Sequence, residues 1–301
     1  MLIAVAATPE VALPTLDALL KSEHELVSVI TRADAQAGRG RELQSSPVSQ
    51  WAVKNGVITH KPISGLELGE VIADVDLVIT IGYGFIIPEN VLLIPKHGFI
   101  NLHFSLLPRW RGAAPVQRAI EAGDKETGVT VFQLDKGMDT GPIYRSSQVE
   151  LSPEDNSADL LQTLAVLGVD QVLETVELIA AGYEPIAQSE IGATRADKLS
   201  KDEGHINWNS DAISIKRKIN AFNPNPGAWS IFREQNLKIN RVRLSEHRLP
   251  SGKIELVSKS VLVGTATDAL ELLEVTPSGK SKLPATSWAN GARITSEDFL
   301  R

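Results

Sequence analysis

The first 188 residues alternate short apolar runs with stretches of helical spacing, and this pattern constrains the fold more than any other feature. Apolar runs typical of strands cover residues 2–7, 26–31, 57–60, 76–81, 98–104 and 128–134. Helical spacing follows at residues 9–20, 47–55, 66–73 and 112–122, with a long amphipathic helix near 155–181. Such alternation is typical of a doubly wound, mostly parallel sheet. We therefore predict a Rossmann-like α/β domain over residues 1–188.

The pattern changes beyond residue 188. Residues 189–209 are polar and predict a connector, and a helix is expected near 210–221. Short alternating runs separated by turn residues then predict a small OB-like β-barrel, so that residues 210–301 form a second domain. Barrels of this type commonly bind oligonucleotides.

Charge is distributed unevenly between the two parts of the chain. Residues 1–188 hold 13 Lys and Arg against 24 Asp and Glu, a net charge of −11. Residues 189–301 hold 17 against 13, a net charge of +4, and most of the excess lies in residues 205–259. A basic region attracts polyanions, of which nucleic acid is the commonest. A solvated basic face without a partner is the alternative that charge alone leaves open.

Several classes of protein are disfavoured by what the sequence lacks. The chain has no cysteine, which excludes disulfides and thiolate chemistry and favours a cytoplasmic location. No apolar run approaches the roughly 18 residues of a membrane span, and the start lacks the pattern of a signal peptide. The six histidines form no HxH or HExxH spacing, so we expect no metal. Neither GxGxxG nor a P-loop is present, which leaves a nucleotide cofactor without support.

The stretch "NLHFSLLPRWRGAAPVQ" places Asn101, His103 and Ser105 at alternating positions of one predicted strand. Their side chains would share one face near the carboxyl end, where open α/β sheets bind ligands. A lone histidine there would more often only pair with a neighbour, but "LDKGMDTGP" adds Asp135 and Asp139 after another strand, at the same predicted edge. An amide donor, an imidazole and a carboxylate suit acyl-type transfer. Without a GxSxG elbow or a cysteine, no covalent acyl-enzyme is suggested.

The order "NxHxSLLPRWRGAAP" followed by "DxGMDTGP" resembles the folate-dependent formyltransferases, and in particular those that act on methionyl-tRNA. The stretches "AGRG", "KLSKDEGHINW" and "FNPNPGAW" extend the resemblance over nearly the whole chain. It implies 10-formyltetrahydrofolate as the formyl donor and the amino group of methionyl-initiator tRNA as the acceptor. It also implies that Asn101, His103 and Asp139 are catalytic. The folate site would include Ser105, Leu106, Leu107 and Pro108.

The chemistry of these residues agrees with the roles that the resemblance implies. Asn101 and His103 would polarise the formyl oxygen, while Asp139 would orient His103 and help to remove a proton from the attacking amine. We expect the tRNA backbone to contact basic residues of the second domain, namely Lys216, Arg217, Lys218, Arg241 and Arg243. The loop "QAGRGRELQ" would close on the acceptor end with Arg39 and Arg41, because arginine pairs with phosphate and stacks on bases. We expect a monomer that does not bind a membrane.

Two other interpretations stay open at this point. A folate formyltransferase for a small amine, such as glycinamide ribonucleotide or an amino sugar, would share the same Asn, His and Asp. The basic second domain and "RWRGAAP" favour tRNA, since a small metabolite needs no such platform. A non-catalytic RNA-binding protein could use the barrel alone, but it would leave the polar cluster unexplained.

Overall fold

The computed structural model describes residues 1–37, 42–295 and 297–301, which form two compact units. The first unit comprises Met1–Pro115, Glu126–Glu150 and Leu161–Ala196, and the second comprises Val116–Lys125, Leu151–Leu160 and Asp197–Arg301. Each unit is made of three separate segments that alternate along the chain, so neither unit is one contiguous range of residues. The domain boundaries at residues 188 and 209 therefore stay predictions.

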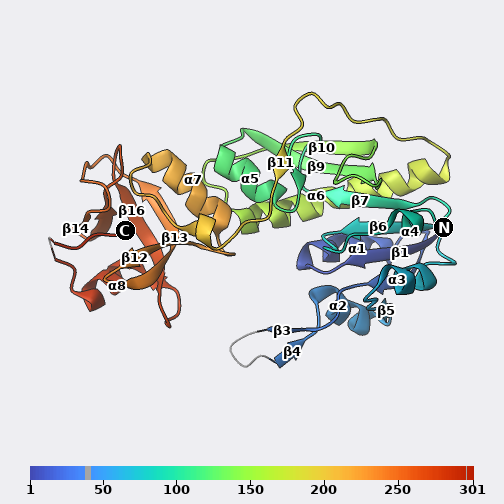
Figure 1. Ribbon diagram of the computed structural model, residues 1–301, viewed down its shortest axis with the longest axis horizontal. Helices are drawn as coiled ribbons and strands as arrows, with labels where there is room; N and C mark the ends of the chain where they lie inside the picture. The colour runs from blue at the N-terminus through green and yellow to red at the C-terminus, as the bar shows by residue number, and fades with distance from the viewer. Residues whose placement is uncertain (38–41, 296) are drawn as a thin grey trace. The chain divides into compact units, whose positions relative to one another are not determined.

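The first unit is built on a seven-stranded sheet in the order β10-β9-β7-β6-β1-β2-β5 (Figure 1). The strands are β1 (Leu2–Ala7), β2 (Glu25–Ile30), β5 (Ile58–His60), β6 (Leu77–Ile81), β7 (Phe99–His103), β9 (Glu126–Gln133) and β10 (Ile143–Glu150). The strands β1, β2, β5, β6 and β7 pair in parallel, whereas β9 pairs antiparallel with both of its neighbours, β7 and β10. The predicted mostly parallel sheet is confirmed.

Helices cover the first unit's sheet, and the core lies between the sheet and these helices. They are α1 (Leu13–Leu19), which follows a 3₁₀ turn η1 (Glu10–Ala12), and α2 (Pro47–Asn55), α3 (Gly65–Val71), α4 (Glu89–Leu92) and α6 (Ser157–Ala180). All five residues of β6 are buried, as expected for a parallel strand that is covered on both faces. Ala4 and Val78 pack with Leu68 of α3 and with Phe99 in one cluster. Burying each large apolar side chain contributes about 1.5–3 kcal/mol to stability.

Local sequence signals set where α2 begins and ends. The Ser46 side chain accepts a hydrogen bond from the Ser49 backbone N–H, and Pro47 occupies the first helical turn, where its missing N–H costs nothing. The helix ends at Gly56, whose φ of 69° is a left-handed conformation that glycine adopts without strain. The helix α2 thus lies between β2 and β5 along the chain, as the alternating pattern predicts.

One strand runs in the direction opposite to our expectation. We expected the run 128–134 to end at the same edge as the run 98–104, but β9 is antiparallel to β7, with Ile100 opposite Gln133 and His103 opposite Thr130. The carboxyl end of β9 therefore lies beside the beginning of β7. The shared carboxyl edge is wrong for this pair, and it is the loop after β9 that carries Asp139 to His103.

The segment after α6 returns along the first unit's sheet. Leu102 of β7 packs against Gly168 of α6, where a Cβ atom would lie only 2.6 Å from a leucine methyl. Beyond α6 this segment runs back past β10 (Figure 1), where Ile186 forms a β-bridge with Ile143. The segment ends at β11 (Arg195–Ala196). There β11 pairs in parallel with β8 (Arg111–Gly112). A short hairpin of β3 (Ala35–Ala37) and β4 (Glu42–Gln44) completes the strands of the described residues in this unit.

The second unit contains an antiparallel sheet in the order β12-β13-β16-β15-β14, with β17 on β16. The strands are β12 (Ala228–Phe232), β13 (Gln235–Leu244), β14 (Ile254–Val257), β15 (Ser260–Val263), β16 (Leu270–Pro277) and β17 (Leu283–Pro284). Its helices are α7 (Ala212–Phe222), which Asp211 caps, and α8 (Ala285–Ala292), with a 3₁₀ turn η2 (Asp202–Gly204), and most of α5 (Pro115–Ala122) also belongs here. The predicted small OB-like domain is confirmed. Among the described residues, no helix is long and apolar enough to span a membrane.

Candidate active site

A cavity of about 660 Å³ lies at the carboxyl ends of β6 and β7, within the size range of small-molecule sites. Its walls are the end of β6, the loop 82–87, the end of β7, residues 112–115 and the loop 134–139. Most of these side chains are apolar. The polar groups include Asn101, His103 and Asp139, so the structure brings the three predicted catalytic residues to one cavity.

Asn101 is held by a neighbouring strand. Thr80 of β6 lies opposite Asn101 in the parallel register, and its hydroxyl donates to the Asn101 Oδ1 at 2.7 Å. Because Oδ1 is engaged, the Nδ2 group with its two N–H donors is left for the cavity. Thr80 is 4% exposed and was missed by sequence reasoning, although its place at the carboxyl end of the adjacent apolar run was a usable signal.

His103 is 5% exposed, and both of its ring nitrogens have defined neighbours. Nε2 lies 2.9 Å from the backbone oxygen of Trp110, and because a carbonyl can only accept, Nε2 carries a proton. Nδ1 is therefore the nitrogen that titrates, and it faces Asp139 Oδ2 at 3.8 Å. Burial lowers the pKa of His103 below its ordinary value, against the opposing effects of the Asp139 charge and the Trp110 carbonyl. The resting imidazole is neutral at physiological pH.

Asp139 has one carboxylate oxygen engaged and one available. Its Oδ2 accepts a hydrogen bond from the Gly112 backbone N–H at 2.7 Å. Within the described residues, Oδ1 has no hydrogen-bond donor. The backbone at Asp139 has a φ of 54°, a left-handed conformation that is unusual outside glycine and that clusters at functional sites. An open carboxylate oxygen beside an amide donor and a neutral imidazole can take a proton from a bound amine.

The four residues of the predicted folate segment, 105–108, do not line this cavity. Ser105 is fully buried, and its hydroxyl donates to the Arg109 backbone oxygen. Its own backbone oxygen accepts from Thr130 at 2.7 Å. The segment therefore builds the turn that brings the Trp110 carbonyl to the histidine ring. Its contact with folate stays a prediction.

Of the seven basic residues predicted to contact tRNA, five belong to the second unit, and three of these five already have partners within it. Lys216 has a side chain only 7% exposed that forms an ion pair with Glu154. Lys218 donates to a backbone oxygen, and Arg243 pairs with Glu271 at 3.0 Å. A cation that already has a protein partner must give up that partner, in whole or in part, before it can bind a phosphate.

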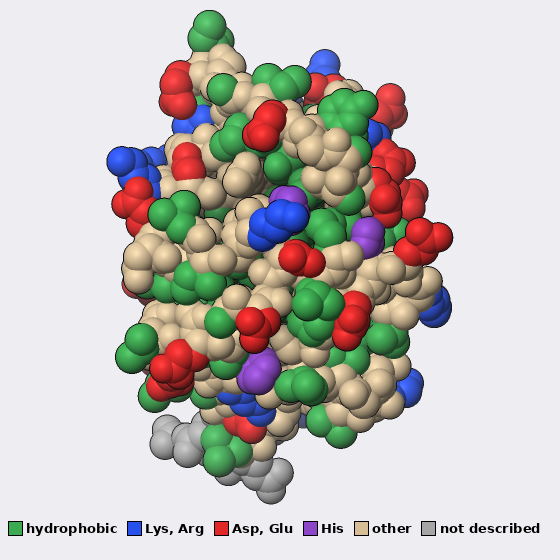
Figure 2. All heavy atoms as spheres, turned by 90° about the vertical axis from the view of Figure 1, so that its right-hand side faces the viewer, with side chains coloured by type: hydrophobic (Ala, Val, Ile, Leu, Met, Phe, Trp, Pro, Cys, Tyr) green, Lys and Arg blue, Asp and Glu red, His purple; other side chains and the backbone are tan. Residues whose placement is uncertain are grey.

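The remaining predicted basic residues differ in what the structure describes. Arg217 covers Gly123, and Arg241 is exposed on β13; neither forms a hydrogen bond or an ion pair with the described residues. Arg39 and Arg41 lie outside the described residues. Acidic side chains are scattered over the face in Figure 2, in accord with the net charge of −11 over residues 1–188. Residues 189–301, with a net charge of +4, are the better partner for a polyanion.

Comparison with known families agrees with the motifs. The profile of the family described as "Formyl transferase" matches residues 1–176. The profile described as "Formyl transferase, C-terminal domain" matches residues 198–293. The chain belongs to the formyl transferase family. The resemblance inferred from the sequence is thereby confirmed.

Relatives within the formyl transferase family align along the whole chain. Methionyl-tRNA formyltransferase of Thermobifida fusca is 44% identical over 303 residues, which cover 98% of this chain and 97% of the relative. The enzyme of the same name from Salinispora tropica is 42% identical over the full length of both chains. This agreement over both units includes the sequence that forms the second, antiparallel sheet.

Solved structures share the fold. HypX from Aquifex aeolicus in complex with tetrahydrofolic acid gives a TM-score of 0.71 at 18% identity, over 100% of this chain and 50% of that one. Methionyl-tRNA formyltransferase from Clostridium thermocellum gives 0.59 at 16% identity, over 81% of this chain and 94% of that one. The N-formyltransferase from Helicobacter canadensis, solved with folinic acid and dTDP-3-aminofucose, gives a TM-score of 0.70 at 20% identity, over 90% of this chain and 99% of that one. The fold is therefore shared by proteins whose names and bound ligands differ.

Proposed function

We propose that the chain transfers the formyl group of 10-formyltetrahydrofolate to the amino group of methionyl-initiator tRNA in the cytoplasm. The observation that carries this proposal is the pair of open groups at one cavity, the Nδ2 donor of Asn101 and the Oδ1 acceptor of Asp139. Transfer of an acyl group between two nitrogens needs a donor for the carbonyl oxygen and an acceptor for the amine proton. Full-length relatives named methionyl-tRNA formyltransferase support the choice of acceptor.

The cavity fits a flat heterocyclic donor. Tyr83, Phe85 and Ile87 form part of its wall, with Leu92 and Leu134. Flat apolar walls with a few polar groups are typical of sites for aromatic ligands, and a pterin offers such a face. The folate supplies an activated formyl group on its N10 atom. The HypX structure was solved with tetrahydrofolic acid, which agrees with a folate site on this fold.

Asn101 acts on the formyl oxygen. Its side-chain N–H groups face the cavity because Thr80 holds the amide oxygen, so they can donate to the oxygen as it gains negative charge. A fixed donor costs little reorganisation when the charge forms, and one such donor contributes roughly 10²–10³ in rate in enzymes of acyl transfer.

Asp139 acts on the attacking amine. Its open Oδ1 takes a proton from the methionyl ammonium, and the freed amine forms a bond to the formyl carbon. The proton on Asp139 is released to solvent. The attacking nitrogen then loses a second proton, the bond between that carbon and the folate N10 breaks, and N10 takes up this second proton. His103, with Nδ1 beside Oδ2 of Asp139, can hold this proton between its loss from the amine and its transfer to N10.

The second unit carries the tRNA in this proposal. Arg241 and Arg217 are cations without a protein partner among the described residues, and a small amine substrate would not need such a unit. Contact with phosphate by these residues would add affinity that weakens as salt rises. The chain acts as a monomer, and no membrane takes part.

The test compares acceptors in one assay. Formyl transfer from 10-formyltetrahydrofolate is measured with methionyl-initiator tRNA, with glycinamide ribonucleotide and with an amino-sugar nucleotide. We expect transfer to the charged tRNA to exceed transfer to either small amine by at least about 10³ in kcat/KM, since remote binding energy accelerates only the correct acceptor. Faster transfer to a small amine would assign another formyltransferase activity. Binding of uncharged tRNA without any formyl transfer would indicate a non-catalytic RNA-binding protein.

A further inference from the structure

The segment between α6 and β11 lies against the catalytic loop of the first unit. Ile186 bridges to Ile143 at the start of β10, with backbone N–O distances of 2.7 and 2.8 Å in the two directions. Thr194 accepts a hydrogen bond from the Trp110 backbone N–H at 2.9 Å. The sequence predicted part of this segment as a plain connector, yet its two ends are fixed, one to Ile143 of β10 and the other to Trp110 next to β8. The residues between those ends are therefore placed with precision.

Gln188 lies in the middle of this segment and reaches the loop of Asp139. Its Nε2 group donates to the backbone oxygen of Asp139 at 3.0 Å and to that of Gly141 at 2.6 Å. Both hydrogens of one amide thus hold the carbonyls on either side of Thr140. The left-handed φ of Asp139 is costly for a residue with a side chain, so it needs contacts of this kind to persist.

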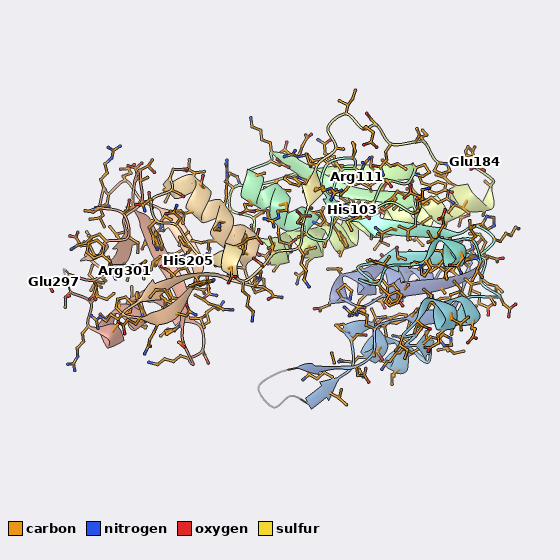
Figure 3. The ribbon with its side chains drawn as sticks, viewed as in Figure 1. His103, Arg111, Glu184, His205, Glu297 and Arg301 are labelled. Carbon is orange, nitrogen blue, oxygen red and sulfur yellow. The ribbon has the colours of Figure 1, made fainter. Side chains whose placement is uncertain are left out.

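Arg111 fixes the orientation of the Gln188 amide. Its Nε and Nη2 atoms donate to the Gln188 Oε1 at 3.2 and 3.0 Å. A guanidinium only donates and a backbone carbonyl only accepts, so the amide cannot turn over without losing every one of these hydrogen bonds. Figure 3 labels Arg111 and His103, which come from β8 and β7 of the first unit.

The residue after Arg111 completes the arrangement. The Gly112 backbone N–H holds the Asp139 carboxylate by Oδ2, while Gln188 holds the Asp139 backbone. Backbone and carboxylate are thus held from one side, and Oδ1 is left for the cavity. The Arg111 side chain is only 11% exposed, so its hydrogen bonds to Gln188 are shielded from competing water.

We propose that Gln188 is a positioning residue for Asp139, which sets the catalytic carboxylate against His103 through the loop backbone. The proposal deepens the proposed function and rests on it. Gln188 does not line the cavity, so it acts on the rate through Asp139 and leaves the binding of folate and tRNA unaffected.

The first test uses Gln188→Glu, with Glu190→Gln as the matched control. Gln188→Glu keeps the size of the side chain but removes both N–H donors, and Gln188→Met removes them without adding a charge. We expect both to lower kcat about 10- to 100-fold with nearly unchanged KM values, because a misplacement of about 1 Å can cost 10²-fold. Glu190 also pairs with Arg111 but does not touch the Asp139 loop, so Glu190→Gln should keep the wild-type kcat. Wild-type kcat in both Gln188 variants would overturn the proposal.

The second test separates positioning from general stability. In an Asp139→Asn background, Gln188→Glu should lower the rate by less than about threefold, since residues that act through one another are not additive. Fully additive losses would contradict the proposal. Amide hydrogen exchange over residues 135–143 should rise in Gln188→Glu but not in Glu190→Gln. Exchange is measured without formyl transfer, so an inactive wild type would reject the proposed function alone, and unchanged exchange would reject the role of Gln188.

Discussion

The cavity of the first unit and the ion pairs of the second unit handle polar groups in opposite ways. In the cavity, Asn101 and Asp139 each have one polar atom with a protein partner and one that faces the open space. In the second unit, Arg233 and Asp298 meet with both carboxylate oxygens, at 2.8 and 2.6 Å. The Arg233 hydrogen bond is the main cause that lowers the pKa of Asp298 to about 2.

The difference separates groups that stabilise the fold from groups that do chemistry. A polar group with all its partners in the protein stabilises the native state, whereas a half-satisfied group in a cavity costs stability that a bound substrate can restore. Polar atoms without a protein partner in a cavity therefore indicate the active site more reliably than the net charge of a region does. Variants that remove one hydrogen-bond partner at a time test this difference between the two units.

The largest effect is expected at Asp139. Asp139→Asn keeps an oxygen for the Gly112 N–H but removes the charge that accepts the amine proton. We expect the rate of formyl transfer to fall by about 10²–10⁴, with little change in folate affinity, because a positioned acid or base contributes that much. Pre-steady-state transfer to charged tRNA measures the rate, and equilibrium binding of a folate analogue is the control. Near wild-type turnover would remove Asp139 from the mechanism.

A smaller effect is expected at Thr80, whose hydroxyl contacts both the Asn101 side chain and the Ile100 backbone oxygen and whose proposed role is to orient Asn101. Thr80→Val matches the shape of threonine without its hydroxyl, so the Asn101 amide loses the contact that fixes Oδ1. We expect kcat to fall about 10-fold, consistent with one net hydrogen bond of 0.5–1.5 kcal/mol. Thr80→Ser keeps the hydroxyl and should recover most of the rate. Equal activity of the valine and serine variants would show that the contact has no role.

A further comparison lies within the second unit, between Arg241 and Arg243. Arg241 has no ion pair with the described residues, whereas Arg243 is paired with Glu271. Arg241→Gln should flatten the slope of log K against log salt for tRNA by roughly 0.7–0.9, the value for one lost phosphate contact. Arg243→Gln should change it less. A salt series of tRNA binding gives both slopes, and an unchanged slope in Arg241→Gln would make this face solvated surface only.

The smallest effect concerns the pH dependence of stability. Burial lowers the pKa of His103, so below about pH 6.5 the unfolded chain binds a proton that the folded chain does not. Stability from this residue is complete above that pH and is lost as the pH falls. The melting temperature of the wild type should therefore drop more steeply from about pH 7 to about pH 5.5 than that of His103→Gln. Parallel curves for the two proteins would contradict a buried neutral His103.

Sequence reasoning reached the fold class and the three polar residues because their signals are local. Buried strands need apolar runs, and Asn101 and His103 interrupt one of them. The direction of β9 could not be predicted, because a short apolar run does not indicate whether its strand pairs parallel or antiparallel with a neighbour. The prediction that β7 and β9 end at the same edge of the sheet was therefore wrong. The loop geometry that joins Asp139 to His103 depends on contacts far apart in the sequence.

Residues that act through single long-range contacts were missed for a physical reason. Gln188 lies in a segment without periodicity, and its two acceptors are more than 40 residues away. Adjacent helical residues point about 100° apart, so the basic run that includes Lys216 faces several directions. One of these directions brings Lys216 to Glu154, and a count of charges along the sequence does not reveal this ion pair.

The most direct test of the account makes the same chemical change in both units. Asp139→Asn and Asp298→Asn each replace one carboxylate by an amide, and for each variant the rate of formyl transfer and the melting temperature are measured near pH 7. We predict that Asp139→Asn loses at least about 10² in rate with a nearly unchanged melting temperature. Asp298→Asn should keep the rate and melt several degrees lower, since loss of a hydrogen-bonded ion pair costs about 1–2 kcal/mol after allowance for its partly exposed arginine. The account is contradicted if Asp298→Asn loses the rate at full stability, or if Asp139→Asn transfers formyl groups as the wild type does.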